Sequence, residues 1–225
     1  MIQEIFDKVV EKKEFSQLPK EDVELAFKTF EKSQISDEEK VKKTRNLLRQ
    51  IYSGFGSKKL MNWKNKSADE VLKKHLSTRE RYNYYEEIYS RLLNGLEKYS
   101  VVDLGAGVNG FSYNFFKGEV DYLGVEAVGQ FVTLTNDFFK KKRIKGLAVH
   151  LSLFDKKKVI NLIKKMKTPR IVFMFKVIDS LEKLERNYTL EFLRELKTVD
   201  IKKIVVSFAT ESWFKRKKFF AKRNW

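Results

Sequence analysis

Apolar positions recur every three to four residues, between charged ones, along the first third of the chain. This spacing predicts amphipathic helices from residue 2 to about residue 74. Pro19 followed by Glu21 and Asp22 suits a helix start, because acidic side chains favour the positive end of the helix dipole. Ser67 with Glu70 three residues later has the pattern of a capping box. Residues 1–74 are therefore expected to form a helical accessory domain.

The pattern changes at Tyr99, where short apolar runs begin to alternate with helical stretches. The five runs are SVVDLG, VDYLGVEAV, GLAVHLSL, RIVFMFKVI and KIVVSFAT. Each is apolar on both faces, as is typical of parallel strands that helices cover on both sides. The order predicts an α/β fold with a Rossmann-like, mostly parallel sheet in a second domain over residues 75–225.

Composition and charge narrow the class of protein. The chain has no cysteine and two histidines, which excludes disulfides and thiolate metal sites and leaves no convincing zinc site, so no metal is expected. It shows no secretory signal and no apolar stretch that could span a membrane, so a cytoplasmic protein is expected. The formal net charge of +17 favours a polyanionic partner such as nucleic acid. A lysine-rich, solvated surface without a partner is the alternative.

The loop after the first predicted strand carries the clearest ligand signal. Asp103-Leu104-Gly105-Ala106-Gly107-Val108-Asn109-Gly110 contains a GxGxxG pattern. Asp103 stands where an acid can accept hydrogen bonds from an amino-acid ammonium, an arrangement that resembles the first motif of class I methyltransferases. Glu126, at the end of the second strand, has the separation of an acid that binds ribose hydroxyls. The two acids together favour an adenosine-containing ligand over a plain strand-to-helix turn or a nicotinamide site.

Four segments, one of which is this glycine loop, resemble one family. The segment His75-Leu76-Ser77-Thr78-Arg79-Glu80-Arg81 resembles the HxSTxER signature of the Arm family, the aminoglycoside-resistance methyltransferases that modify guanine N7 in small-subunit ribosomal RNA. The loop 103–109 resembles its DxxxGxN motif, Phe175-Lys176 with Leu181-Glu182 its FKxxPxLE segment, and Ser207-Phe208 through Arg216 and Lys218 its VSFPTxSLxGRxKGM stretch. The matches are ordered and similarly spaced.

The resemblance implies a class I fold that uses S-adenosylmethionine and acts on the small ribosomal subunit. Arg79 is expected to pair with the methionine carboxylate, braced by His75 and Thr78. The implied cofactor-binding residues are His75, Thr78, Arg79, Asp103, Gly105, Ala106, Gly107, Asn109, Glu126 and Phe175. Lys176 and Glu182 are the implied active-site pair, which would hold the target base and order the site. We expect a monomer.

Guanine N7 carries a lone pair and no proton, so methylation there requires no general base. RNA contacts are expected from Trp213, Arg216 and Lys218 and from lysine clusters at residues 58–59, 140–143, 156–158 and 215–223. Structural alternatives remain open for these residues. Residues 75–81 can simply cap a helix, Lys176 and Glu182 can form a buried ion pair, Phe175 and Trp213 can belong to the core, and the helical domain can be a packing appendage.

Departures from the family pattern leave other functions open. Asp179 and Ala209 replace family prolines, and Phe214, Lys215 and Lys217 replace the glycines that flank Arg216. The third strand ends at His150-Leu151-Ser152, without the acid that many class I enzymes place near the adenine amino group. The family's final antiparallel hairpin is expected to be missing, because the sequence ends at Trp225. The alternatives are a methyltransferase for another RNA or a small molecule, and a noncatalytic RNA-binding or ribosome-assembly protein.

Overall fold

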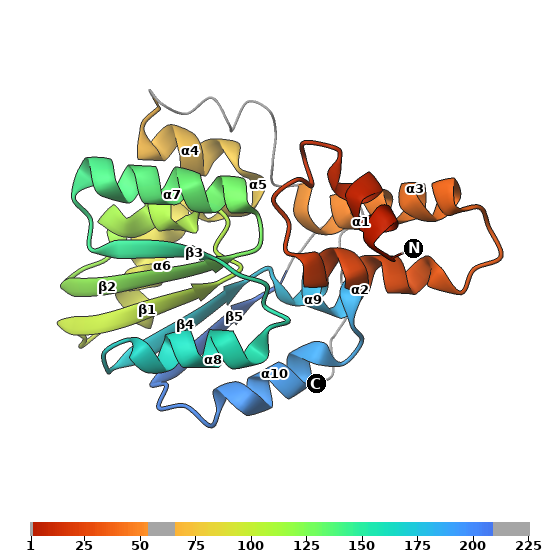
Figure 1. The fold of residues 1–225 in the computed structure, drawn as a ribbon. Helices are drawn as coiled ribbons and strands as arrows, with labels where there is room; N and C mark the ends of the chain where they lie inside the picture. The colour runs from red at the N-terminus through yellow and green to blue at the C-terminus, as the bar shows by residue number, and fades with distance from the viewer. Residues whose placement is uncertain (1, 54–65, 209–225) are drawn as a thin grey trace.

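The computed structural model describes residues 2–53 and 66–208 (Figure 1). The helices before the sheet are α1 (Ile2–Val10), α2 (Lys20–Glu31), α3 (Asp37–Leu48), the π-helix η1 (Arg49–Ser53), α4 (Ala68–Lys74), α5 (Leu76–Arg81), the 3-10 helix η2 (Tyr82–Tyr84) and α6 (Tyr85–Leu92). The elements that follow are β1 (Lys98–Leu104), the 3-10 helix η3 (Asn109–Phe115), β2 (Glu119–Glu126), α7 (Gly129–Lys142), β3 (Gly146–His150), α8 (Lys156–Lys165), β4 (Arg170–Phe175), α9 (Ile178–Leu184), α10 (Tyr188–Leu196) and β5 (Lys203–Ser207).

The five strands form one parallel sheet in the order β3-β2-β1-β4-β5. The direction in which successive strands are added reverses between β1 and β4. This is the topological switch point, where ligands bind in parallel sheets of this kind. Asp103, near the end of β1, lies opposite Gly124 of β2 and Phe173 of β4. The Rossmann-like α/β prediction is confirmed. The expected loss of the final hairpin concerns residues outside the described ranges.

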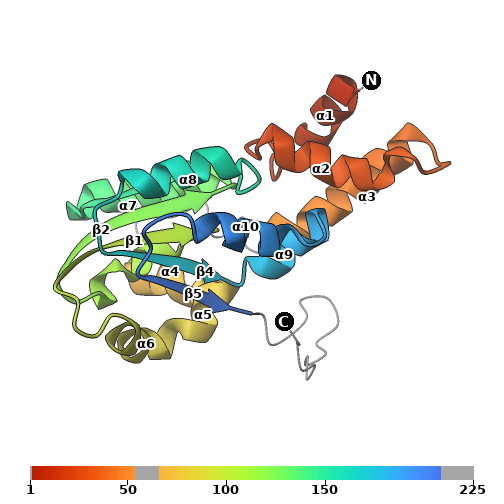
Figure 2. The ribbon, with the colours of Figure 1, turned by 90° about the horizontal axis from the view of Figure 1, so that it is seen from below.

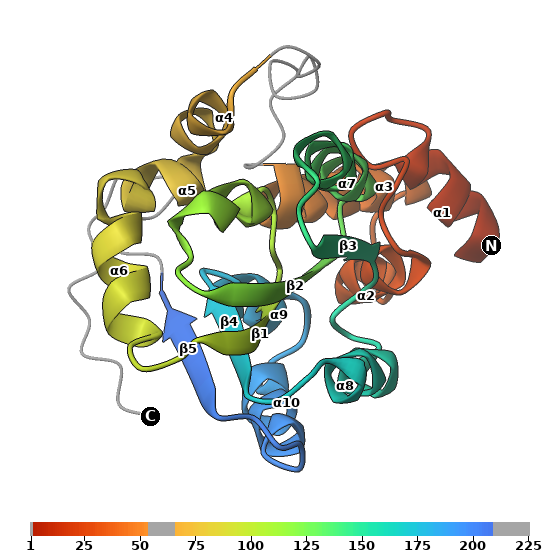
Figure 3. The ribbon, with the colours of Figure 1, turned by 90° about the vertical axis from the view of Figure 1, so that its left-hand side faces the viewer.

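Alternate side chains of the strands enter two separate hydrophobic cores. Tyr99 and Val101 of β1 pack with α6 and α7 on one face of the sheet. Val102 and Leu104 pack with α8 and α10 on the other face. Figure 2 shows α8 and α10 over this second face, and Figure 3 shows α4, α5, α6 and α7 on the first. This burial on both faces explains why the strands are apolar throughout.

Helices α1, α2 and α3, with η1 at the end of α3, form a helical body beside the carboxyl ends of the strands (Figure 1). Its core is continuous with that of the first sheet face. α2 contacts α9, and the backbone N–H of Gly129 donates to the carbonyl of Gln17 at 3.2 Å. α4 instead packs against α5 and η3, on the side of the sheet. The helical body therefore meets the sheet at the edge where its strands end.

Two helices begin at the residues that the sequence predicted for their N-termini. Pro19 precedes α2, and Glu21 and Asp22 occupy its first turn. Ser67 accepts from the N–H of Glu70, whose carboxylate accepts from the N–H of Ser67, so the capping box is confirmed. Within the described ranges, no helix is long and apolar enough to cross a membrane.

Candidate active site

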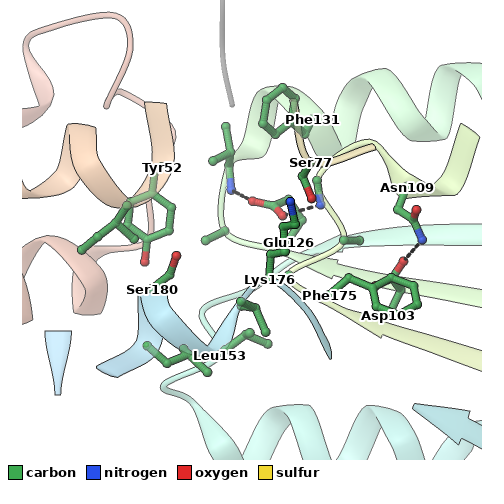
Figure 4. A pocket seen from close by; sticks show the side chains of 18 of the residues that line it. Tyr52, Ser77, Asp103, Asn109, Glu126, Phe131, Leu153, Phe175, Lys176 and Ser180 are labelled. Carbon is green, nitrogen blue, oxygen red and sulfur yellow. Dashed lines mark hydrogen bonds between the residues drawn. The ribbon is translucent and has the colours of Figure 1, made fainter. Parts of the chain in front are cut away.

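A deep cavity lies at the carboxyl ends of β1, β2 and β4, between the sheet and the helical body. It contains about 760 Å³ of space between atoms, including solvent at its mouth. Figure 4 shows Asp103 and Asn109 at one end, Glu126 in the middle, and Tyr52 and Ser180 at the other end. Of the residues predicted to bind a cofactor, those that line the cavity are His75, Thr78, Asp103, Gly105, Ala106, Gly107, Asn109, Glu126 and Phe175.

The glycine loop after β1 approaches the cavity with its backbone. Gly105 and Gly107 have φ values of +73° and +53°, which side chains disfavour. A Cβ on Gly105 would lie 2.6 Å from Val177, so this position accepts no other residue without movement. The loop thus leaves room for a ligand because its glycines carry no side chains.

Asp103 is fully buried beneath this loop. Its Oδ2 accepts hydrogen bonds from Asn109 Nδ2 at 2.7 Å and from the Tyr122 hydroxyl at 2.8 Å. Its Oδ1 has no hydrogen-bond partner among the described residues. Burial raises the pKa of Asp103, whereas the two hydrogen bonds and the charge of Arg81 lower it. A buried carboxylate oxygen without a donor is costly, which indicates that a ligand supplies the donor.

Glu126 is the last residue of β2, and its side chain is hydrogen-bonded to the glycine loop. Its two carboxylate oxygens accept from the backbone N–H groups of Gly107 and Val128, each at 2.7 Å. Burial raises the pKa of Glu126 to about 7, although both hydrogen bonds lower it. Each oxygen keeps a further lone pair, so the carboxylate can also accept from hydroxyl groups of a ligand.

Helix α5 supplies the wall next to Asp103. His75 is buried before its first turn, and burial, with the charges of Arg81 and Lys176, lowers its pKa to about 3, so the imidazole is neutral. The Thr78 hydroxyl donates to the carbonyl of Leu72 at 2.7 Å and so ties α5 to α4. The Thr78 hydroxyl also lies 3.1 Å from the carbonyl of His75, and both residues line the cavity.

The cation at this wall is Arg81, whereas Arg79, predicted for this role, is exposed and lines neither cavity described here. The guanidinium of Arg81 lies 4.7 Å from the centre of the Phe175 ring and donates to Asn109 Oδ1 at 3.3 Å and to Ser77 Oγ at 3.2 Å. Positions 77 and 81 are four apart and share one face of the helix, while position 79 points elsewhere. This periodicity was available in the sequence.

Lys176, directly after β4, forms an ion pair with Glu80 of α5. The pair is not the one predicted. Glu182 lines neither cavity, and its carboxylate accepts from the N–H groups of Asn187 and Thr189 at 2.7 and 2.8 Å. It therefore satisfies backbone donors at the start of α10. Lys176 and Glu182 are not brought together by the fold.

A second cavity adjoins the first and shares two of its residues, Arg81 and Lys176. Its other lining residues are Glu80, Tyr84, Ile88, Ser207 and Phe208. Tyr84 is 57% exposed, which leaves it accessible to a ligand in this cavity. Two ligands bound in these cavities would meet beside Arg81 and Lys176.

Residues of the helical body also line the first cavity, which sequence patterns did not predict. They are Asp22 of α2 and Ile51 and Tyr52 of η1. The Tyr52 hydroxyl donates to Asp22 Oδ2 at 2.6 Å, and the Ser152 hydroxyl after β3 donates to Asp22 Oδ1. The N-terminal helices therefore close one end of the cavity, and the contact between Asp22 and Ser152 joins residues that are 130 positions apart in the sequence.

The predicted RNA-binding residues are placed unevenly. Trp213, Arg216 and Lys218, and the clusters at 58–59 and 215–223, lie outside the described residues. The cluster at 140–143 ends α7, at the edge of the sheet away from the cavity (Figure 1). The cluster at 156–158 begins α8, where Lys156 pairs with Glu191 and Glu195. Across residues 2–53 and 66–208, no group of three or more acids and histidines is arranged to hold a metal ion.

Three solved structures share this fold. The 16S rRNA methylase RmtB is 16% identical, with a TM-score of 0.74, over 93% of this chain and 85% of its own. An rRNA methylase from Escherichia coli is 16% identical, with a TM-score of 0.75, over 94% and 85%. The 16S rRNA methyltransferase RmtF, solved with S-adenosyl-L-homocysteine, is 19% identical, with a TM-score of 0.74, over 96% and 83%. The comparison with curated protein sequences finds no match.

A family model described as ribosomal RNA methyltransferase (FmrO) matches residues 39–224. The match includes the α5 segment, the glycine loop and the β4 to α9 segment, which carried the resemblance. It confirms the predicted activity, a methyltransferase acting on ribosomal RNA, and agrees with the predicted S-adenosylmethionine cofactor. The chain belongs to the ribosomal RNA methyltransferase (FmrO) family.

Proposed function

We propose that the first cavity binds S-adenosylmethionine and that the enzyme methylates N7 of a guanine in the 16S rRNA of the small subunit. The observation that carries this proposal is that Arg81 and Lys176 line both cavities, so that a cofactor in the first and a base in the second would meet beside them. RmtB is a 16S rRNA methylase and RmtF a 16S rRNA methyltransferase, which supports the same substrate here.

The residues present fit the cofactor group by group. Asp103 Oδ1, buried and without a partner, is the acceptor for the ammonium. Arg81 is the cation for the methionine carboxylate, since a guanidinium binds a carboxylate in bidentate fashion. Glu126 is the acceptor for the ribose hydroxyls. Asp103 and Arg81 would thus hold the amino-acid end of the cofactor and Glu126 its ribose, and Figure 4 shows Asp103 at one end of the cavity and Glu126 in the middle.

S-adenosylmethionine supplies an electrophilic methyl group when it is bound. The protein's task is to hold the base, align its N7 and exclude water, because the N7 lone pair needs no proton removed. In the second cavity, the Glu80 carboxylate can accept from the N1–H and amino group of guanine, and Lys176 can donate to O6. The exposed Tyr84 ring can stack on a base taken out of the RNA helix. Adenine and pyrimidines lack this set of donors and acceptors.

The remaining expectations extend this proposal. The helical body, within the predicted 1–74 domain, would grip ribosomal RNA together with Trp213, Arg216 and Lys218. The exposed large apolar side chains of the described segments, Tyr84, Leu147 and Leu190, lie on different elements and form no common patch, which supports a monomer. Its substrate would place the enzyme in the cytoplasm.

Transfer of a labelled methyl group tests the function. The protein is incubated with labelled S-adenosylmethionine and small subunits, large subunits, free 16S rRNA or a pool of metabolites, and the modified base is mapped. We expect 7-methylguanosine at one site in the small subunit. Label in metabolites or in another base would refute the substrate assignment, and cofactor binding without transfer to any RNA would favour a noncatalytic RNA-binding protein.

A further inference from the structure

The end of β3 lacks the acid that many class I methyltransferases place near the adenine amino group. The strand runs Gly146–His150 and is followed by Leu151 and Ser152, with no acid in this stretch. In the structure, a carboxylate from another part of the chain occupies this place. It belongs to Asp22, in the first turn of α2, which receives a hydrogen bond from the Ser152 hydroxyl.

The Asp22 carboxylate is fixed in position. It is 1% exposed and accepts from two hydroxyls, Tyr52 and Ser152. Ser152 is itself oriented, because its oxygen accepts from the N–H of Phe154 at 3.0 Å. Two of about four lone-pair sites on the carboxylate are thus used, and the others remain for a ligand.

No cation forms an ion pair with this buried acid within the described residues. Its only hydrogen-bond donors there are the two neutral hydroxyls. Burial raises the pKa of Asp22 to about 6, although the hydrogen bonds from Ser152 and Tyr52 lower it, so the carboxylate is mostly ionised at pH 7. A buried, ionised carboxylate without a cation is costly, and such groups gather at functional sites.

Asp22 also stands at the correct end of the cavity. It lines the cavity together with Tyr52 and Leu153. Figure 4 shows Tyr52, its partner, across the cavity from Asp103, with Glu126 between them. A ligand held by its amino-acid end at Asp103 and by its ribose at Glu126 therefore directs its base toward Asp22.

We propose that Asp22 accepts a hydrogen bond from the 6-amino group of the cofactor's adenine, an inference that rests on the proposed function. The helical body is then part of the cofactor site, and an acid from α2 replaces the one that β3 lacks. The specificity for adenine comes from a carboxylate that repels any purine with an oxygen at position 6.

The test compares two ligands that differ at this position. Calorimetry measures the affinities of S-adenosylhomocysteine and S-inosylhomocysteine, whose 6-oxygen replaces the amino group, for the full chain. We expect the wild-type protein to bind the adenosine compound at least about tenfold more tightly, because a charge-assisted hydrogen bond is lost and a repulsion gained. In Asp22→Asn the ratio should approach one, since the amide can donate to the 6-oxygen.

Glu24→Gln is the matched control, since Glu24 lies on the same helix, pairs with Lys20 at 3.7 Å on the surface and does not line the cavity. It should keep the wild-type ratio. An unchanged ratio in Asp22→Asn, or a ratio near one in the wild-type protein, would overturn the proposal. The second result needs no variant and so holds even where Asp22→Asn fails to fold. Failure of the wild-type protein to bind S-adenosylhomocysteine would instead refute the proposed function.

Discussion

Replacing Asp103 with asparagine separates ligand binding from stability. In Asp103→Asn, the amide oxygen can take the place of Oδ2 and accept from Asn109 and Tyr122, as the carboxylate does. The amide NH₂ then occupies the position of Oδ1, the oxygen without a partner. The variant therefore presents a donor to the cavity where the wild-type protein presents an acceptor.

The expected loss follows from one charge-assisted hydrogen bond. Such a bond contributes about 1.5–3 kcal/mol, which corresponds to an affinity for S-adenosylhomocysteine about 10- to 150-fold weaker. The stability of the ligand-free protein should be unchanged or higher, because burial raises the pKa of Asp103 and the variant removes that buried charge. The two effects have opposite signs, which distinguishes a lost ligand contact from a damaged fold.

Isothermal calorimetry and thermal unfolding measure the two effects. Asp121→Asn is the matched control, since Asp121 lies on β2 and pairs with Lys145 at 2.6 Å, away from the cavity. It should leave the affinity unchanged. Wild-type affinity in Asp103→Asn would refute the role of Oδ1, and a fall in melting temperature that parallels the loss of affinity would assign the effect to packing of the loop.

Three further predictions concern other parts of the site. Arg81→Ala should weaken S-adenosylhomocysteine binding by about tenfold or more in calorimetry, whereas Arg79→Ala should leave it unchanged; equal effects would contradict the assignment. The pKa of Glu126 is about 7 in the folded protein, against 4.5 for the ordinary group, so the folded state binds this proton more tightly than the unfolded state does. The stability that results from this proton is fully present below pH 4.5 and is lost as the pH rises to 7. The melting temperature of the ligand-free wild-type protein should therefore fall over this range relative to Glu126→Gln, and parallel pH profiles would refute the shift. Tyr84→Ala should reduce methyl transfer to small subunits about 5- to 150-fold without changing cofactor affinity, while the exposed Leu147→Ala should change neither; an unaffected transfer rate in Tyr84→Ala would exclude stacking.

The sheet could be predicted from the sequence because its signals are local. Each strand is a short apolar run, and the glycine loop with Asp103 follows β1 directly. Glu126 was predictable for the same reason, since it ends β2 one strand away. Patterns that depend on neighbours in the sequence therefore identified most of the cavity wall that the sheet provides.

One part of the site could have been predicted better, and one required the structure. Arg81 occupies the arginine of the HxSTxER pattern and lies four residues after Ser77, whereas Arg79 stands at a variable position of that pattern, so the sequence already favoured Arg81. Asp22 reaches the cavity only through the packing of α2 against the sheet domain, and its contact with Ser152 spans 130 residues. Such a contact has no local signature, so the acid missing after β3 could not be located from the sequence.

The central claim is that the cavity at the ends of β1 and β2 holds the methyl donor for ribosomal RNA. Methyl transfer from labelled S-adenosylmethionine to small ribosomal subunits, measured for the wild-type protein and Asp103→Asn at one cofactor concentration below saturation, tests it most directly. The account predicts 7-methylguanosine in the wild-type reaction and about 10- to 150-fold less in the variant. Equal transfer by both proteins, or label on a base other than guanine, would contradict it.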